Sequence, residues 1–288
     1  MHSEPLPRPF GVLLAEQVRT VRLALRWEIL LAAAALVVIG ALIVMMGLRY
    51  QERLDLTPEI LQPALIAALV LPFRVWKSDP VFEGAFLWTL PVRRQHAAMA
   101  KLIAGAAWLL AAMLALLATL AIAALATGGS FGIEETRAVA SANGASAAQV
   151  RWTTPVWTWL VPFGAALMVY LFSSAAVLGL RYPLRWSAGL MVLGTLILFL
   201  ASGIASDGAV EHIIGWFRDT VMIGRYGLDF ALNAGEGALS YWVDDPGPGG
   251  HRVWTALPVA GQWAMALIVW LGIASLALAA AIRRHWER

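Results

Sequence analysis

The stretch ILLAAAALVVIGALIVMM, residues 29–46, runs for eighteen residues without a charged or polar side chain. At 1.5 Å per residue, a helix of this length spans about 27 Å, close to the roughly 30 Å hydrocarbon core of a bilayer. A helix that is apolar on every face needs an apolar environment all around it. The stretch therefore predicts a transmembrane helix.

The composition of the whole chain agrees with that assignment. Of 288 residues, 60% are hydrophobic and 14% are charged, whereas an ordinary soluble domain has about 45–50% apolar and 25% charged residues. Further apolar runs extend the prediction to a single transmembrane domain over residues 1–288. We expect an all-α polytopic membrane protein with six transmembrane helices, at about 28–47, 60–76, 101–126, 155–180, 187–205 and 255–282.

Two of these predicted spans contain prolines or neighbouring serines. Pro63 and Pro72 fall in the short second span, which we expect to be kinked or to cross incompletely. Ser173 and Ser174 lie inside the fourth span with no His near them in the sequence. Their hydroxyls are expected to bond the backbone of their own helix or of a neighbouring one.

Charge is distributed unevenly between the two sides that the spans define. The side with both termini, the 74–101 loop and the 181–186 turn carries 14 of the 21 Lys and Arg residues and 6 of the 18 Asp and Glu residues, a net charge of +8. The opposite side carries the other 7 basic and 12 acidic residues, a net charge of −5. The positive-inside rule then predicts a multi-pass protein of the inner (cytoplasmic) membrane with both termini cytoplasmic. Basic charge spread over membrane-adjacent loops does not indicate nucleic-acid binding.

The segment 10–26, FGVLLAEQVRTVRLALR, is amphipathic. Its apolar residues recur at helical spacing, and its three arginines lie along another face. We expect an interfacial helix in the cytoplasmic headgroup layer, with Arg19, Arg22 and Arg26 as membrane-surface anchors on the lipid bilayer. The alternative is the start of the first span, with arginines that only reach back to the interface.

Two long segments lie on the acidic side. The segment 206–254 mixes aromatic and charged residues and contains the turn-rich DDPGPGG. We expect one or two short helices there, followed by a loop. The segment 127–149, TGGSFGIEETRAVASANGASAAQ, is rich in small residues, and we expect a mobile loop.

The sequence contains no catalytic constellation. It has no Cys, no HExxH zinc motif, no phosphate-binding glycine loop and no GxSxG elbow. His212 with Glu211, and His251 with Asp244 and Asp245, are compatible with a metal site, but solvated loop residues explain them better. The middle of each predicted span holds no ionisable residue, which argues against an ion-coupled carrier. We expect neither enzyme activity nor a cofactor in this chain.

The block DPVFEGAFLWTLPVRRQHAAMAK, residues 79–101, connects the second and third predicted spans on the basic side. Asp79 and Pro80 are typical of a helix start, and Pro91 of a helix end. The spacing between them predicts a short cytoplasmic helix at 79–90 with an apolar, partly aromatic face, formed by Phe82, Phe86, Leu87 and Leu90. Such a helix either docks in a groove of another protein or re-enters the headgroup layer, and the spacing leaves both open.

This block resembles the region between spans two and three of ABC-2 type permeases, the membrane subunits of bacterial ATP-binding cassette (ABC) exporters. The family pattern is an acidic residue with Gly, a leucine-rich turn, Pro, a basic or small residue, and a Lys at the start of span three. The matching residues here are Glu83, Gly84, Leu90, Pro91, Arg93 and Lys101. Phe82 and Ala85 stand where the family commonly has a second acid and a Thr. The amphipathic N-terminal helix, the six spans and the long segment before the last span are similar to the family as well.

The resemblance implies a permease subunit of an ABC exporter that moves a lipophilic or amphipathic substrate. It implies a second permease subunit, in a homodimer or heterodimer, and separate ABC ATPase subunits that bind ATP and Mg²⁺. The helix at 79–90 would be the coupling helix. The residues implied to contact the ATPase are Asp79, Phe82, Glu83, Phe86, Leu87, Leu90, Arg93 and Arg94.

Two other functions remain compatible with the residues. One is a non-transporting immunity or scaffold subunit that binds a partner through the same cytoplasmic helix. The other is a membrane-embedded enzyme that acts on lipid through the segment 206–254.

Overall fold

The computed structural model describes residues 10–77, 94–140, 147–180, 215–244 and 250–286, together with the isolated residues 182, 183, 185, 189, 192 and 212. The long helices are α1 (Phe10–Ala24), α2 (Arg26–Tyr50), α3 (Ala64–Lys77), α4 (Arg94–Thr127), α5 (Val161–Gly179) and α9 (Ala260–Trp286). The shorter helical segments are η1 (Pro58–Leu61), η3 (Val156–Leu160), η4 (Arg218–Met222) and α8 (Leu228–Asn233).

Five helical segments of the described chain are long and apolar enough to cross a membrane. They are Arg26–Tyr50, Pro58–Trp76, Gln95–Thr127, Val156–Gly179 and Ala260–Arg283. These segments coincide with five of the six predicted spans, in agreement with a helical membrane-protein class. The predicted span 187–205 lies outside the described residues apart from Gly189 and Val192, so the sixth span stays a prediction.

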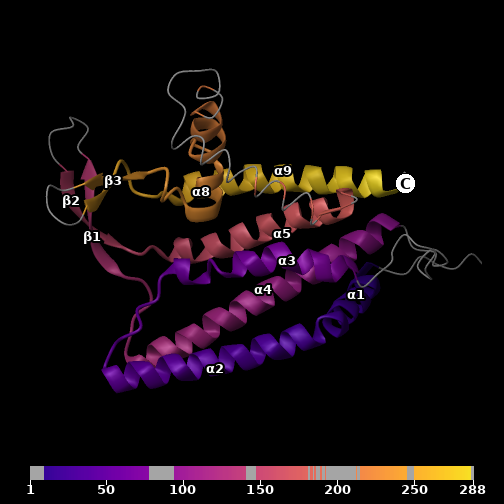
Figure 1. Cartoon of the computed structure of the whole chain (residues 1–288), viewed down its shortest axis with the longest axis horizontal. Coiled ribbons are helices and arrows are strands. Elements are labelled where there is room, and N and C mark those ends of the chain that lie inside the picture. Colours follow the sequence, from indigo (N-terminus) through magenta and orange to yellow (C-terminus); the bar gives the residue numbers. More distant parts are fainter. Residues whose placement is uncertain are drawn as a thin grey trace, which may run out of the picture.

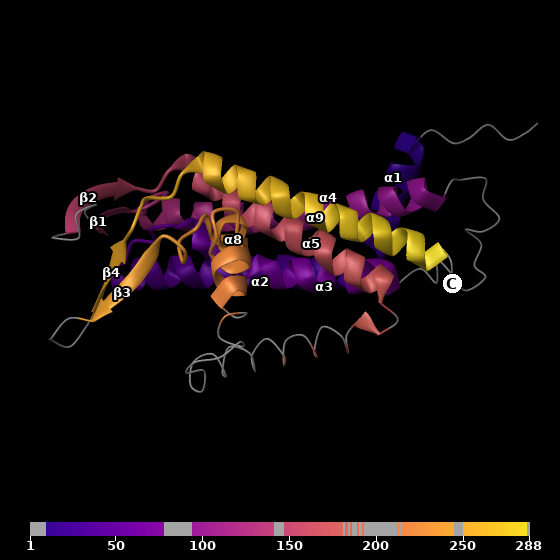
Figure 2. The same ribbon diagram turned by 90° about the horizontal axis from the view of Figure 1, so that it is seen from above.

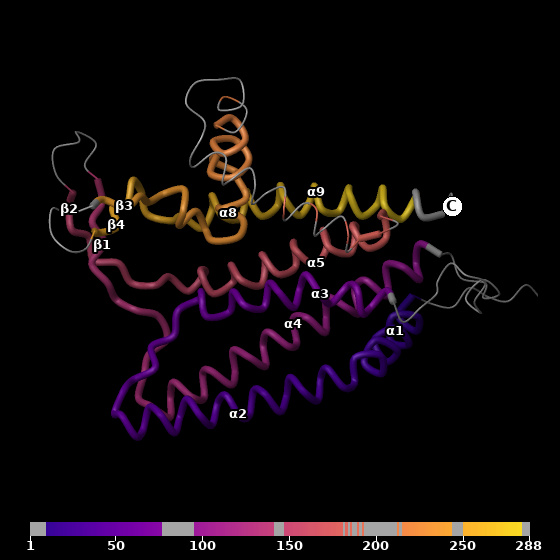
Figure 3. The backbone as a smooth tube through the Cα atoms, in the orientation of Figure 1, coloured from indigo at the N-terminus to yellow at the C-terminus, as the bar shows by residue number. Residues whose placement is uncertain are grey.

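The long helices form an elongated bundle (Figure 1; Figure 3). α2 packs on α4, α3 lies between α4 and α5, and α5 packs on α9. α1 lies at one end of the bundle and a small β-sheet lies at the other. We call these the α1 end and the sheet end.

Small residues allow the helices to approach closely, as membrane helices commonly require. Gly40 of α2 faces the Thr119 side chain of α4, and Gly105 of α4 faces the Tyr170 hydroxyl of α5. Tyr170 is fully buried, and its hydroxyl donates to the Leu102 carbonyl at 3.1 Å. The contact between α4 and α5 is thus fixed by a glycine and one side-chain hydrogen bond.

The predicted second span is divided at its prolines. It begins as the 3₁₀ turn η1 and continues as α3 after Pro63, with Pro72 inside the helix. Proline has no N–H, which removes one backbone hydrogen bond from α3. Near this gap, the Ser173 hydroxyl of α5 donates to the Leu69 carbonyl at 2.6 Å. The expectation that this serine bonds a helix backbone is therefore confirmed, and the backbone is that of a neighbouring helix.

The sheet end contains four strands in the order β2-β1-β4-β3. The strands are β1 (Glu134–Ala140), β2 (Ala147–Thr153), β3 (Ser240–Asp244) and β4 (Gly250–Trp254). β1 and β2 are antiparallel, as are β3 and β4, while β1 and β4 are parallel, with Ala138 opposite Val253 and Val139 opposite Trp254. The parallel pair joins a hairpin that precedes α5 to a hairpin that precedes α9 (Figure 2).

This sheet differs from what the sequence predicts for both long segments. Residues 134–140 and 147–153 form paired strands, although a mobile loop is expected at 127–149. In 206–254, the short helices η4 and α8 agree with the expectation, but β3 and β4 replace the expected loop. Alternation of Thr, Arg and Val with small residues is a weak strand signal, and the pairing with distant residues supplies the rest of the stabilisation.

Candidate functional site

The segment predicted to bind an ATPase connects α3 to α4, and the two helix ends that flank it lie at the α1 end. α3 ends at Lys77 and α4 begins at Arg94. Val21 and Leu25 belong to the same buried cluster as Val75 and Trp76 from the last turn of α3. Seven of the predicted contacts, Asp79, Phe82, Glu83, Phe86, Leu87, Leu90 and Arg93, lie outside the described residues. Arg94 opens α4, and only its backbone is described.

The amphipathic helix predicted at 10–26 is present as α1. Its buried face is formed by Leu13, Gln17 and Val21, spaced four residues apart. Trp108 of α4 holds the helix in place, because its indole N–H donates to the Val18 carbonyl at 3.2 Å. The predicted anchors Arg19, Arg22 and Arg26 are all exposed. The structure thus separates the arginines from the face that packs on the bundle.

Lys101, a residue of the family pattern, lies buried at the same end. Only 3% of Lys101 is exposed, and its ammonium lies 5.4 Å from the centre of the Trp76 ring. A cation over an indole face is attracted by the negative face of the ring. This contact connects the start of α4 to the end of α3, on either side of the 78–93 segment.

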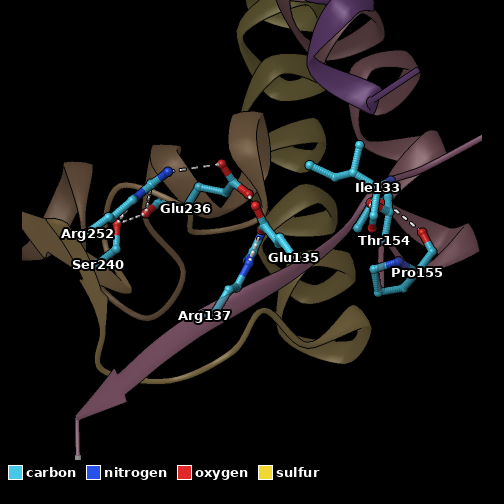
Figure 4. A network of polar contacts seen from close by, with 9 residues as sticks. Ile133, Glu135, Arg137, Thr154, Pro155, Glu236, Ser240 and Arg252 are labelled. Atoms are coloured by element: carbon cyan, nitrogen blue, oxygen red, sulfur yellow. Dashed lines mark hydrogen bonds and ion pairs between the residues drawn. The ribbon is translucent and has the colours of Figure 1, made fainter. Parts of the chain in front are cut away.

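A network of charged side chains connects the sheet to the helices at the sheet end (Figure 4). Glu236, in the turn between α8 and β3, receives ion pairs from Arg137 of β1 at 3.6 Å and from Arg252 of β4 at 3.7 Å. Arg252 also donates to the Glu236 carbonyl at 2.6 Å and to the Ser240 hydroxyl at 2.7 Å. Glu135 pairs with the Nε atom of Arg137. One glutamate therefore ties two strands to the turn that follows α8.

Aromatic rings hold the guanidinium groups of this network. Arg137 lies 4.7 Å from the ring centre of Trp152 and 3.9 Å from that of Trp254, and Arg252 lies 4.6 Å from Trp254. The Arg137 side chain is only 11% exposed. Its Nη1 atom is buried with no hydrogen-bond partner in the described part of the chain. The two indole faces partly compensate for that missing acceptor.

The carboxyl of Glu236 has an altered acidity. Burial raises the pKa of Glu236 above its usual range, and the negative charge of Glu59 raises it further, while Arg137 and Arg252 lower it without cancelling the rise. A carboxyl whose pKa is raised by folding contributes stability that is present below its ordinary pKa and is lost as pH rises through the raised value. Folding therefore disfavours the charged form of the Glu236 carboxyl.

Two adjoining cavities open beside this network. Their volumes are about 300 and 760 Å³, within the roughly 300–1,000 Å³ range of small-molecule sites. Both are lined by Thr57, Glu59, Ile133, Arg137, Glu236 and Arg252. We refer to the two together as the sheet-end cavity. It combines charged groups with apolar wall residues, which is the composition of a site for an amphipathic ligand.

Sequence reasoning did not identify Glu59, Arg137, Glu236 or Arg252 as site residues. A usable signal was present in HRVW at 251–254, where one residue separates Arg252 from Trp254. Two residues of one strand separated by a single residue share a face, so Arg252 and Trp254 are placed together by spacing alone. Nothing in the local pattern brings Arg137 to Trp254, because that contact depends on the parallel pairing of β1 and β4.

Within the described residues, no three His, Asp or Glu side chains converge to hold a metal ion. Of the suggested metal-site residues, Glu211 and Asp245 lie outside the described part of the chain. Comparison with known proteins finds no matching family model, no matching curated protein and no matching solved structure.

Proposed function

We propose that this chain is the membrane subunit of an ABC exporter, which moves a lipophilic or amphipathic substrate with energy from ATP hydrolysis by a separate ATPase. The observation that carries the proposal is the arrangement of the α1 end. There the end of α3 packs against α1, and Lys101 near the start of α4 lies against Trp76. The segment with the ABC-2-like pattern is thus held at both ends by packed helices.

This arrangement suits the transmission of movement. A helix that docks in an ATPase groove can move the spans only if its two attachments are rigid. Trp76 and Lys101 are both more than nine-tenths buried, so force applied between them reaches α3 and α4. The chain has no phosphate-binding glycine loop, which is why the proposal assigns ATP and Mg²⁺ to the partner.

The proposed orientation places the α1 end in the cytoplasm and the sheet end on the outer face of the inner membrane. It follows from the net charge of +8 on the side of the α1 end and −5 on the other side. The exposed arginines of α1 then face anionic headgroups of the cytoplasmic leaflet. A second permease subunit completes the transport path in this proposal.

Orientation can be tested with single cysteines, because the natural chain has none. Ala15→Cys on α1 and Ala148→Cys on β2 replace exposed alanines at opposite ends. In intact spheroplasts, a membrane-impermeant maleimide is expected to label Ala148→Cys and to leave Ala15→Cys unlabelled until the membrane is permeabilised. Labelling of Ala15→Cys alone in intact spheroplasts would invert the proposed orientation.

The function itself is tested by purification in mild detergent. Wild-type chain is expected to bring down an ATPase, and the Phe82→Ala/Glu83→Ala/Phe86→Ala variant is expected to lose the co-purifying ATP hydrolysis. A Tyr241→Ala/Trp242→Ala variant on β3 serves as control, since both side chains are exposed at the opposite end. It is expected to retain the ATPase.

Two results would contradict the proposal. A well-folded wild-type chain that brings down no ATPase from its native host would remove the partner. Equal ATPase recovery with the triple variant and the wild type would show that the 79–90 segment is not the contact.

A further inference from the structure

The charges around the sheet-end cavity are not balanced. Arg137 pairs with Glu135 and Glu236 and keeps one buried nitrogen, Nη1, without a hydrogen-bond partner in the described residues, and Arg252 contacts Glu236 and Ser240. Asp229 is occupied too, because its carboxylate accepts from the Ala238 N–H at 2.7 Å and the Asn233 amide at 3.2 Å. Glu59 is exposed, and its carboxylate has no ion-pair partner in the described part of the chain. The smaller cavity is lined by three carboxylates and two arginines, so its lining has a formal net charge of −1 when all of them are ionised.

The two glutamates of the cavity act on each other. Glu59 and Glu236 both line the two cavities, and the negative charge of Glu59 is one cause of the raised pKa of Glu236, so the two carboxylates repel. Glu59 comes from η1 and Glu236 from the turn after α8, so the repulsion acts across the cavity wall rather than within one element. A cation placed between them relieves that repulsion and gains from both charges.

One part of the remaining wall of the smaller cavity is apolar. It includes Pro58, Pro155 and Pro162, together with the indole of Trp152. Pro58 begins η1, which leads into α3, and Pro162 lies in the first turn of α5. Part of the apolar wall therefore lies where two spans begin, with Glu59 directly after Pro58 and Glu236 toward the sheet. An apolar wall beside carboxylates accommodates a ligand with an apolar body and a charged end.

We propose that the sheet-end cavity is a binding site for an amphipathic organic cation, with its ammonium or guanidinium group between Glu59 and Glu236 and its apolar part against the proline-lined wall. Binding of such a cation can be measured on the isolated chain and does not depend on the exporter function. The assignment of this cation class as the substrate of the exporter, with the cavity on the outer face, rests on the proposed function.

Three small probes that differ mainly in charge test the proposal: 2-phenylethylammonium, 2-phenylethanol and 3-phenylpropanoate. Saturation-transfer NMR on the purified full chain in detergent gives their dissociation constants. The cation is expected to bind about tenfold more tightly than the alcohol, as a charge-assisted contact in a partly buried site provides. The carboxylate is expected to bind most weakly.

Glu59→Gln is the informative variant, because Glu59 is exposed and has no ion-pair partner in the described residues, so its replacement is expected to leave the fold intact. It is expected to reduce the preference for the cation over the alcohol to about twofold or less. Glu52→Gln, an exposed glutamate that does not line the cavity, is expected to keep the full preference. Thermal unfolding of each variant checks that the fold is retained.

Three results would overturn the proposal: equal affinity for all three probes, tightest binding of the carboxylate, or a cation preference that survives Glu59→Gln. Displacement of 2-phenylethylammonium by micromolar Ca²⁺ would reassign the cavity to a metal ion and overturn it as well. None of these measurements involves an ATPase. Loss of the proposed exporter function and loss of the proposed cation site are therefore separate outcomes.

Discussion

Arg137→Ala is expected to destabilise the sheet end by about 2–3 kcal/mol, because it removes the cation from a partly buried ion-pair network with two aromatic contacts. The arginine contacts two tryptophans and two glutamates, and its side chain is only 11% exposed. Its loss leaves Glu236 facing Glu59 with Arg252 as the remaining cation. It also opens a gap between Trp152 and Trp254.

The measurement is thermal unfolding of the detergent-solubilised chain, together with limited proteolysis of the 134–153 hairpin. Arg151→Ala is the matched control. It removes an arginine of the same sheet whose side chain is 77% exposed and pairs with Glu134, and exposed pairs contribute about 0–1 kcal/mol. Equal effects of the two substitutions would show that the Arg137 network does not stabilise the sheet.

Arg137→Lys separates charge from shape. A lysine keeps the positive charge for Glu236 but cannot lie flat against two rings or pair through two nitrogens at once. We expect it to recover less than half of the stability lost in Arg137→Ala. Full recovery would mean that charge alone explains the role of the residue.

Gly105→Ala is expected to destabilise the helix bundle by about 2–3 kcal/mol, even though alanine favours a helix by about 1 kcal/mol over glycine. A Cβ at this position falls inside contact distance of the Tyr170 hydroxyl and 3.0 Å from its Cζ atom. Tyr170 is fully buried. The ring has to shift, which weakens the hydrogen bond to Leu102 and leaves a buried hydroxyl poorly paired.

Gly272→Ala provides the comparison, because a Cβ there meets nothing within 4 Å. It is expected to be neutral or slightly stabilising in the same unfolding assay. In a Tyr170→Phe background the clash with the hydroxyl is absent, so Gly105→Ala should cost about 1 kcal/mol less there. If the cost is unchanged in that background, the contact between Gly105 and Tyr170 does not account for the effect.

The predictable part of the fold is the part encoded by local pattern. The eighteen apolar residues at 29–46 indicate α2 without any tertiary information, and the apolar residues at helical spacing in 10–26 indicate α1. The division of the second span at Pro63 is likewise a property of one residue. These features depend on residues within a few turns of each other.

The candidate site could not be found in the same way. Arg137 meets Trp254 only because β1 and β4 pair in parallel, and Glu236 meets both arginines only because the turn after α8 lies against that pair. The contacts of Arg137 with Trp254 and Glu236 join parts of the chain separated by two predicted spans, whereas Glu236 and Arg252 both lie in the segment 206–254. Short strands of mixed composition carry little information about such partners.

The parallel pairing of β1 with β4 also dictates an order of assembly. The β1–β2 hairpin is translated before α5, whereas β4 is translated only just before the final helix α9. Until β4 arrives, one long side of β1 has unpaired backbone groups of the kind that recruit other strands. The nascent protein therefore carries an open sheet edge while the chain between β1 and β4 is synthesised, and the last hairpin to be delivered is the one that closes it.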